Sequence, residues 1–139
     1  MAKTVATILG AAFLLVGLLG FVVPGLLGTH LSMTHNVVHL VSGALSLYFG
    51  LQGTLSAARL FCLVFGAVYG LLGIAGFLAG RPGTVSPGMP GMESGDFILK
   101  VIPGMLELGT ADHILHIVLG AIYVAGGLMT RADLTRATT

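Results

Sequence analysis

The stretch LFCLVFGAVYGLLGIAGFL, at residues 60–78, contains no charged side chain. A helix rises about 1.5 Å per residue and must cross roughly 30 Å of hydrocarbon, so this stretch is long enough to span a membrane. Three similar stretches predict further helices at about 5–23, 37–55 and 112–130. Helices satisfy their own backbone hydrogen bonds in lipid, so we predict an all-α integral membrane protein with one transmembrane domain, residues 1–139.

The composition agrees with this class. Hydrophobic residues make up 55% of the chain and charged residues 8%, whereas roughly one-quarter of the residues in a soluble domain are charged. Six Lys and Arg residues and a net charge of +1 do not provide a basic surface that follows a phosphate backbone. We therefore expect the lipid bilayer, and no nucleic acid, to be a partner of this protein.

The distribution of charge predicts the orientation of the helices. With four spans, both termini lie on the same side of the membrane. The cations expected on that side are Lys3, Arg59, Arg131 and Arg136, with one acid, Asp133. The opposite side carries Arg81 and Lys100 with Glu93, Asp96, Glu107 and Asp112. Because cytoplasmic loops carry the excess of Lys and Arg, we predict that both termini are cytoplasmic.

Two copies of one pattern predict an internal duplication. The segment HLVSGAL, which begins at His39, matches HIVLGAI, which begins at His116, and VVPGLL at residues 22–27 matches VIPGML at residues 101–106. Each copy contains two spans, so we predict a four-helix bundle made of two duplicated transmembrane hairpins in parallel orientation. Residues 81–100 contain three Pro-Gly pairs and are predicted to form an extracytoplasmic loop over the bundle.

Small residues recur at three- and four-residue steps along the predicted helices. In lipid, such stripes mark the faces on which helix backbones approach closely. The glycines that we predict as packing positions are Gly10, Gly17, Gly20, Gly43, Gly50, Gly66, Gly70, Gly73, Gly120 and Gly127. His39 and His116 belong to the same stripes, so we expect both imidazoles to lie inside the bundle rather than against lipid.

The chain resembles an uncharacterised bacterial family of four-helix membrane proteins, catalogued as domain of unknown function 4383. The segments that carry the resemblance are GLLGF at residues 17–21, NVVHLVSG at 36–43, YGLLG at 69–73 and ADHILHIVLG at 111–120. The resemblance covers nearly the whole chain, but the Gly- and Met-rich stretch at residues 84–96 is not part of it. The resemblance implies a four-helix fold and a location in a bacterial membrane. It does not point to any activity, because none is established for the family.

Three hypotheses account for the interior histidines. In the first, their imidazoles only form hydrogen bonds between helices, while Thr34 and Asp112 cap the helix starts. In the second, His39 and His116 ligate a tetrapyrrole, a haem or a chlorophyll-type pigment, and Gly43 and Gly120, one turn deeper, make room for the macrocycle.

In the third hypothesis, histidines at the outer face bind copper or zinc. The candidate ligands are His35, His39, His113 and His116, with His30 nearby. Thioether and imidazole together favour Cu(I), and methionines stand close by at Met33, Met89, Met92 and Met105.

The sequence lacks the motifs of phosphate-binding loops, nucleophile elbows and paired zinc cysteines, so we expect no enzymatic activity. A chain of 139 residues with four spans has little extramembrane chain for chemistry. We therefore predict a small structural or accessory subunit, which packs in or onto a larger membrane complex or associates with itself. The predicted location is the bacterial cytoplasmic (inner) membrane or a related internal membrane.

Overall fold

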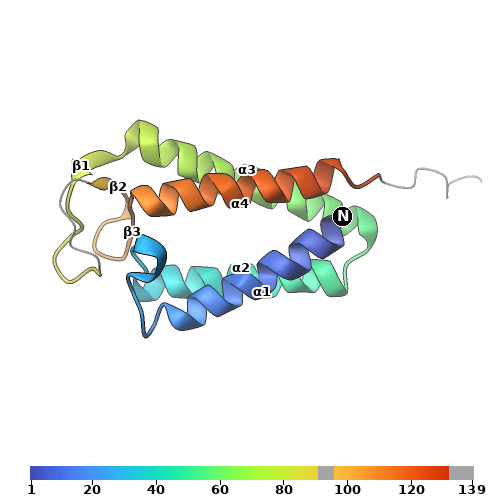
Figure 1. Cartoon of the computed structure of the whole chain (residues 1–139), viewed down its shortest axis with the longest axis horizontal. Helices are drawn as coiled ribbons and strands as arrows, with labels where there is room; N and C mark the ends of the chain where they lie inside the picture. The colour runs from blue at the N-terminus through green and yellow to red at the C-terminus, as the bar shows by residue number, and fades with distance from the viewer. Residues whose placement is uncertain (91–95, 132–139) are drawn as a thin grey trace, which may run out of the picture.

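The computed structural model describes residues 1–90 and 96–131. The elements are α1 (Ala2–Leu19), the 3-10 turn η1 (Leu26–Gly28), α2 (Met33–Leu51), α3 (Leu55–Ala79), β1 (Arg81–Gly83), β2 (Asp96–Ile102), β3 (Leu106–Leu108) and α4 (Thr110–Leu128). The helices run lengthwise beside one another, the strands gather at one end, and the N-terminus lies at the other (Figure 1).

Each helix begins two to five residues before its predicted start, because the first turns contain polar residues that a hydropathy argument passes over. The Ser32 hydroxyl caps α2 by accepting the N–H of His35, and Thr54 caps α3 by accepting the N–H of Ala57. The expectation that Thr34 caps α2 is therefore wrong. Asp112 does serve the start of α4, where its carboxylate accepts the N–H of Gly109.

Three helices, α1, α3 and α4, are long and apolar enough to cross a membrane, which indicates a membrane protein. The fourth, α2, is similarly long but carries a polar stripe. The buried residues of α2 are His35, Asn36, His39, Ser42, Gly43, Ser46 and Gly50. Its exposed side chains include Val37, Val41 and Leu45. Polar groups of α2 thus face the protein and apolar groups face outward.

The glycines that we predicted as packing positions lie at contacts within two helix pairs. Between α1 and α2, a Cβ at Gly10 would lie 2.9 Å from the backbone nitrogen of Leu47, and a Cβ at Gly43 would lie 2.9 Å from the carbonyl oxygen of Gly10. Between α3 and α4, a Cβ at Gly120 would lie 2.5 Å from the backbone nitrogen of Gly70. Only glycine allows the backbones to come this close. The other predicted glycines, at residues 17, 20, 50, 66, 73 and 127, contact the same partner helices.

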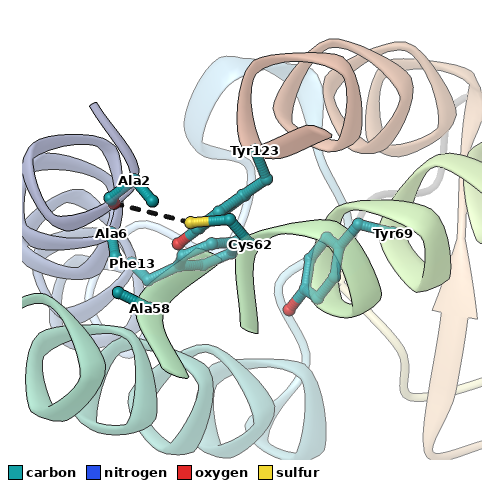
Figure 2. Close-up of a cluster of buried hydrophobic side chains, with 7 residues drawn as sticks. All are labelled: Ala2, Ala6, Phe13, Ala58, Cys62, Tyr69 and Tyr123. Carbon is teal, nitrogen blue, oxygen red and sulfur yellow. Dashed lines mark hydrogen bonds between the residues drawn. The ribbon is translucent and has the colours of Figure 1, made fainter. Parts of the chain in front are cut away.

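An aromatic cluster joins the two helix pairs (Figure 2). Phe13 of α1 packs edge-on against Tyr69 of α3, with 5.2 Å between ring centroids, and Tyr123 of α4 is fully buried beside them. Two hydrogen bonds cross from α2: the Ser42 hydroxyl lies 2.9 Å from the Tyr69 hydroxyl, and the Ser46 hydroxyl lies 2.6 Å from the Tyr123 hydroxyl. The hydroxyls of both tyrosines thus find partners inside an otherwise apolar core.

The prediction of an all-α protein is wrong in one respect, because a three-stranded antiparallel sheet of order β1-β2-β3 caps one end. The run FILKVI at residues 97–102 is rich in β-branched and large apolar residues, which favour a strand. The three Pro-Gly pairs within residues 81–100 predict only a loop there, whereas β1 and most of β2 lie in this segment. A further pair, Pro103 and Gly104, forms the turn between β2 and β3, where Gly104 has a φ of +75°.

Glu107 of β3 is a fully buried carboxylate outside the helices. It accepts hydrogen bonds from the backbone N–H and the hydroxyl of Ser86, at 2.7 and 2.5 Å, and from the N–H of Gly104, at 2.8 Å. Burial alone would raise the pKa of Glu107, but these donors and the ammonium of Lys100, 3.6 Å away, hold the pKa below its ordinary value. The carboxylate thereby ties residue 86 to the β2–β3 turn.

The opposite end of the molecule joins the helix termini. The N–H of Ala2 donates to the Thr130 hydroxyl, at 2.7 Å, so the start of α1 lies beside the end of α4. Two cations bind carbonyl oxygens at helix C-termini: Lys3 donates to Leu51 at 3.4 Å, and Arg59 donates to Gly127 at 3.2 Å. Two positively charged side chains, Lys3 and Arg59, therefore lie at the end that is remote from the sheet.

Candidate metal centre

Three histidines meet between the helix pairs, and we call His35, His39 and His116 the histidine triad. His35 and His39 lie one turn apart on α2, with 4.4 Å between their ring centroids, and His116 approaches from α4, 6.0 Å from His35. One potential ligand nitrogen from each residue lies within 4.8 Å of the other two. The side chains are buried, since the three residues are 2%, 8% and 5% exposed.

Hydrogen bonds determine which nitrogen of His35 is free. The Nδ1 of His35 lies 3.0 Å from the carbonyl oxygen of His30, which can only accept, so Nδ1 carries the proton. The lone pair of neutral His35 is then on Nε2. A histidine that donates one ring N–H to a carbonyl while the other nitrogen stays free has the arrangement of a typical metal ligand.

The other two members of the triad have an unsatisfied nitrogen each. Within the described residues 1–90 and 96–131, the buried Nδ1 atoms of His39 and His116 have no hydrogen-bond partner, and outside the triad the same holds for Nδ1 of His113 and Oδ1 of Asn36. An unpaired buried polar atom costs about 1–3 kcal/mol, so two of them in one cluster need an explanation. A bound metal ion or another ligand would provide one.

Asp112 connects the triad to the surrounding loops. Its Oδ2 accepts the N–H of Gly109, at 2.8 Å, and the N–H of His30, at 3.1 Å, while its Oδ1 lies 4.0 Å from Nδ1 of His35. Asp112 is 2% exposed. The carboxylate thus fixes the segment before α2 onto the start of α4 and places a negative charge beside the triad.

Aromatic side chains form the deep wall of the site. The ring of Phe13 lies 5.4 Å from that of His39, and the ring of Tyr69 lies 5.1 Å from that of His116. Tyr69 is itself held by its hydrogen bond to Ser42. These contacts restrict the imidazoles, and Phe13, together with the triad, also lines a cavity.

That cavity, which we call the α1/α4 cavity, has a volume of about 150 Å³. The triad and Asp112 line it together with apolar side chains of α1, η1 and α4, among them Leu9, Val16, Leu26, Leu115 and Leu119. One side of the triad therefore faces an apolar space. Pockets for drug-sized ligands measure about 300–1,000 Å³, so this one suits an ion or a small ring.

The structure separates His113 and His30 from the triad, although both belong to the predicted outer-face cluster. The Nε2 of His113 lies 2.8 Å from the carbonyl oxygen of Phe97, and its ring packs against Phe77 of α3. The Nε2 of His30 lies 3.1 Å from Oδ2 of Asp96. His113 thus joins α4 to the sheet, and His30 joins the connection between η1 and α2 to the sheet.

Within the described residues, Met33, Met89 and Met105 of the predicted cluster do not line the cavity beside the triad. Met33 and Met105 are 74% and 53% exposed, and Met89 packs with Val85 and Ile98. Met92 lies outside the described residues. The donor set that the structure brings together is therefore imidazole only, which suits Zn²⁺ and copper ions.

Gly43 and Gly120, which the tetrapyrrole hypothesis requires as space beside the macrocycle, face neighbouring helices. Gly43 contacts Gly10 and Leu14 of α1, and Gly120 contacts Gly66 and Gly70 of α3. Together with the small volume of the α1/α4 cavity, this geometry favours a single ion over a macrocycle. A haem or pigment stays a hypothesis, which the visible absorption spectrum of the native protein would test.

Sequence reasoning identified all three members of the triad but missed the groups around them. Phe13, Ser42 and Tyr69 support the site from α1, α2 and α3, and no short motif links them. The available signal was the four-residue spacing from His35 to His39 and from Asp112 to His116, which places each pair on one helix face. Only the packing of the helices reveals which of these faces meet.

Comparisons with known proteins identify the family. The model of the family described as "Domain of unknown function (DUF4383)" matches residues 24–129, and the chain belongs to this family. The match includes the triad, Asp112 and the sheet, and begins after α1. Neither the curated proteins nor the solved structures include a match to this chain.

Proposed function

We propose that this member of the DUF4383 family is a non-enzymatic membrane protein that binds one transition-metal ion, Zn²⁺ or a copper ion, through the histidine triad. The convergence of three buried imidazole nitrogens within 4.8 Å carries the proposal. Nitrogen ligands about 2.0 Å from a tetrahedral Zn²⁺ lie roughly 3.3 Å from one another, so small rotations of the three rings would close the site.

The charge at the site also favours a cation. Three neutral imidazoles do not balance the positive charge of a metal ion. The carboxylate of Asp112 adds a negative charge, 4.0 Å from Nδ1 of His35. The apolar surroundings strengthen this attraction because they exclude water. The carbonyl of His30 and Asp112 together form a second shell, which orients His35 and raises its basicity as a ligand.

The test is metal binding by the purified, metal-free protein in lipid nanodiscs. We expect one equivalent of Zn²⁺ per chain, measured by competition with a chromogenic chelator, and loss of this binding in His39→Ala and His116→Ala. His113→Ala is the matched control, because His113 is also a buried histidine of α4 but bonds to Phe97 instead. Helical circular dichroism verifies that each variant is folded.

Two results would contradict the proposal. Equal Zn²⁺ affinity in the wild type and His116→Ala would mean that any bound zinc is elsewhere. Equal loss in His113→Ala and His116→Ala would mean that the loss reflects general disruption of α4 and not removal of a ligand. Either result would favour the hypothesis that the histidines serve only in helix packing.

We further propose that the protein lies in the bacterial cytoplasmic membrane with both termini in the cytoplasm. Lys3, Arg59 and Arg131 near the sheet-free end support this orientation by the positive-inside rule. The duplicated-hairpin hypothesis gains support from the positions of His39 and His116, each six residues after the first residue of its helix. Reporter fusions and accessibility labelling of single cysteines on each side would test the orientation.

A role as an accessory subunit of a larger membrane complex is compatible with metal binding. Apolar side chains are exposed along all four helices, for example Ile8, Leu45, Leu71 and Val118. Lipid, a second copy or another membrane subunit would each cover these faces. Affinity purification from native membranes in a mild detergent, followed by mass spectrometry, would identify a stable partner.

A further inference from the structure

We propose that the α1/α4 cavity admits a lipid-soluble phenol-type ring from the bilayer, and that the ring oxygen occupies the open coordination position of the metal at the histidine triad. This inference rests on the proposed metal site. Three protein ligands around a tetrahedral ion leave a fourth position for water or an external ligand. In this protein the triad faces the α1/α4 cavity, so a fourth ligand would come from there.

The volume of the α1/α4 cavity favours a ligand with a single six-membered ring. This volume is about 150 Å³. An engineered cavity of about this volume, lined by Leu, Ile and Phe in another protein, stays dry and binds benzene. A macrocycle or a phospholipid headgroup exceeds the space, whereas a six-membered carbon ring fits it.

The side chains that line the α1/α4 cavity favour a ring with few polar groups. Leucines from three elements, Leu9, Leu26 and Leu115, form apolar walls, and the triad lies among them. A ligand with several polar groups would leave some of them unpaired against these walls, at a cost of roughly 1–3 kcal/mol each. A ring with a single hydroxyl instead places its apolar edge on the leucines and its oxygen on the metal.

The route into the cavity follows from the way α1 and α4 separate. They contact each other near the N-terminus of α1, where Ala2 bonds to Thr130 and Val5 packs on Gly126. Farther along, the cavity lies between them, and exposed Ala12 and Leu27 line it. Ala12 lies exposed on α1, which is apolar and long enough to cross a membrane, so on this side the entrance would face the hydrocarbon and not the aqueous phase.

The test uses 4-fluorophenol and ¹⁹F NMR on the full-length protein in nanodiscs. Bound Co²⁺ is paramagnetic and broadens the signal of a fluorine nucleus only when that nucleus is within a short distance, whereas Zn²⁺ causes no such broadening. Probe that is merely dissolved in the bilayer stays narrow. We therefore expect 4-fluorophenol to broaden in the presence of the Co²⁺ protein and not of the Zn²⁺ protein.

Two alanines of α1 provide matched variants. Ala12 lines the cavity, and Ala11 is also exposed but does not line it. We expect Ala12→Phe to fill the entrance and abolish the broadening, while Ala11→Phe retains it. Both variants should bind Co²⁺ like the wild type, as judged by its visible absorption bands, because neither residue contacts the metal. The probe 4-fluorotoluene, which has a similar size but no oxygen, should broaden much less.

Each other outcome rejects part of the reasoning. Co²⁺ binding without broadening of 4-fluorophenol in the wild type would overturn the inference and leave the metal site standing. Equal broadening in Ala12→Phe would show that the probe reaches the metal by another route. Equal broadening of 4-fluorotoluene would remove the role of the oxygen. The absence of Co²⁺ bands in the wild type would overturn the metal site and, with it, this inference.

Discussion

Replacing Ser46 by alanine is expected to destabilise the protein more than replacing its partner Tyr123 by phenylalanine. The Ser46 hydroxyl donates to the carbonyl oxygen of Ala6, at 2.8 Å, and lies 2.6 Å from the Tyr123 hydroxyl. Because Ser46 has one proton and gives it to Ala6, Tyr123 is the donor to Ser46. Both residues are fully buried.

The two substitutions leave different groups behind, and this sets the magnitudes. Tyr123→Phe removes a donor, while Ser46 keeps its bond to Ala6; the expected loss is about 0.5–1.5 kcal/mol. Ser46→Ala leaves the Tyr123 hydroxyl buried without its acceptor, and the expected loss is about 1–3 kcal/mol. The carbonyl of Ala6 is inside α1 and keeps its helical hydrogen bond, so it adds little.

The assay is a double-mutant cycle. Unfolding of the wild type, both single variants and the double variant is followed by circular dichroism in dodecyl maltoside micelles with increasing fractions of sodium dodecyl sulfate. In the Tyr123→Phe background, Ser46→Ala no longer orphans a hydroxyl, so it should cost less than in the wild type. Membrane hydrogen bonds average about 0.6 kcal/mol in such cycles, and we expect a coupling of at least this size.

Additive losses, within about 0.3–0.5 kcal/mol, would refute this hydrogen-bond assignment. So would a larger loss for Tyr123→Phe than for Ser46→Ala. The parallel pair Ser42 and Tyr69 provides a second cycle, since its hydroxyls lie 2.9 Å apart across the same interface.

Three further predictions concern the second shell, the sheet and the helix contacts. Asp112→Asn should weaken Zn²⁺ binding about 10- to 100-fold in chelator competition, because it removes the charge beside His35. Glu107 has a lowered pKa, so its stabilising effect is present above its ordinary value of 4.5 and is lost as the pH falls through the lowered pKa. The protection factors of the sheet amides, which are the ratios of the intrinsic to the observed exchange rate at each pH, should therefore fall from about pH 5 downward in the wild type, and Glu107→Gln should remove this pH dependence. Gly120→Ala should lower the free energy of unfolding by about 1–3 kcal/mol in detergent titrations, whereas Gly25→Ala, at an open position, should change it little.

The sequence predicted the helices well because lipid imposes a simple rule. Long stretches without charge must form helices, and stripes of glycine must face other helices. The sheet was missed because its short strands lie among Pro-Gly pairs, and strand pairing depends on a partner far along the chain. β2 pairs with β1 across residues 84–95, and propensity alone does not reveal that partner.

The repeats illustrate a second limit of sequence reasoning. Residues 22–27 and 101–106 have similar sequences, but the first leads into η1 and the second forms the turn from β2 to β3. The difference arises from context: residues 101–106 begin within β2, which pairs with β1 and β3, while residues 22–27 follow the end of α1. Similar segments therefore predict similar helix positions, but not similar connections.

The histidine triad is best understood from what a purely structural role would require. Imidazoles that serve only helix packing are expected to satisfy both ring nitrogens, as the cost of buried polar atoms demands. His113 also has an unpaired Nδ1, but its Nε2 bonds to Phe97, its ring packs on Phe77, and it does not line the α1/α4 cavity. His39 and His116 likewise have an unpaired Nδ1 each, and both residues line the cavity that lies where α1 and α4 separate. Loss of packing and loss of hydrogen bonding thus coincide at one place, and a bound ligand would compensate both.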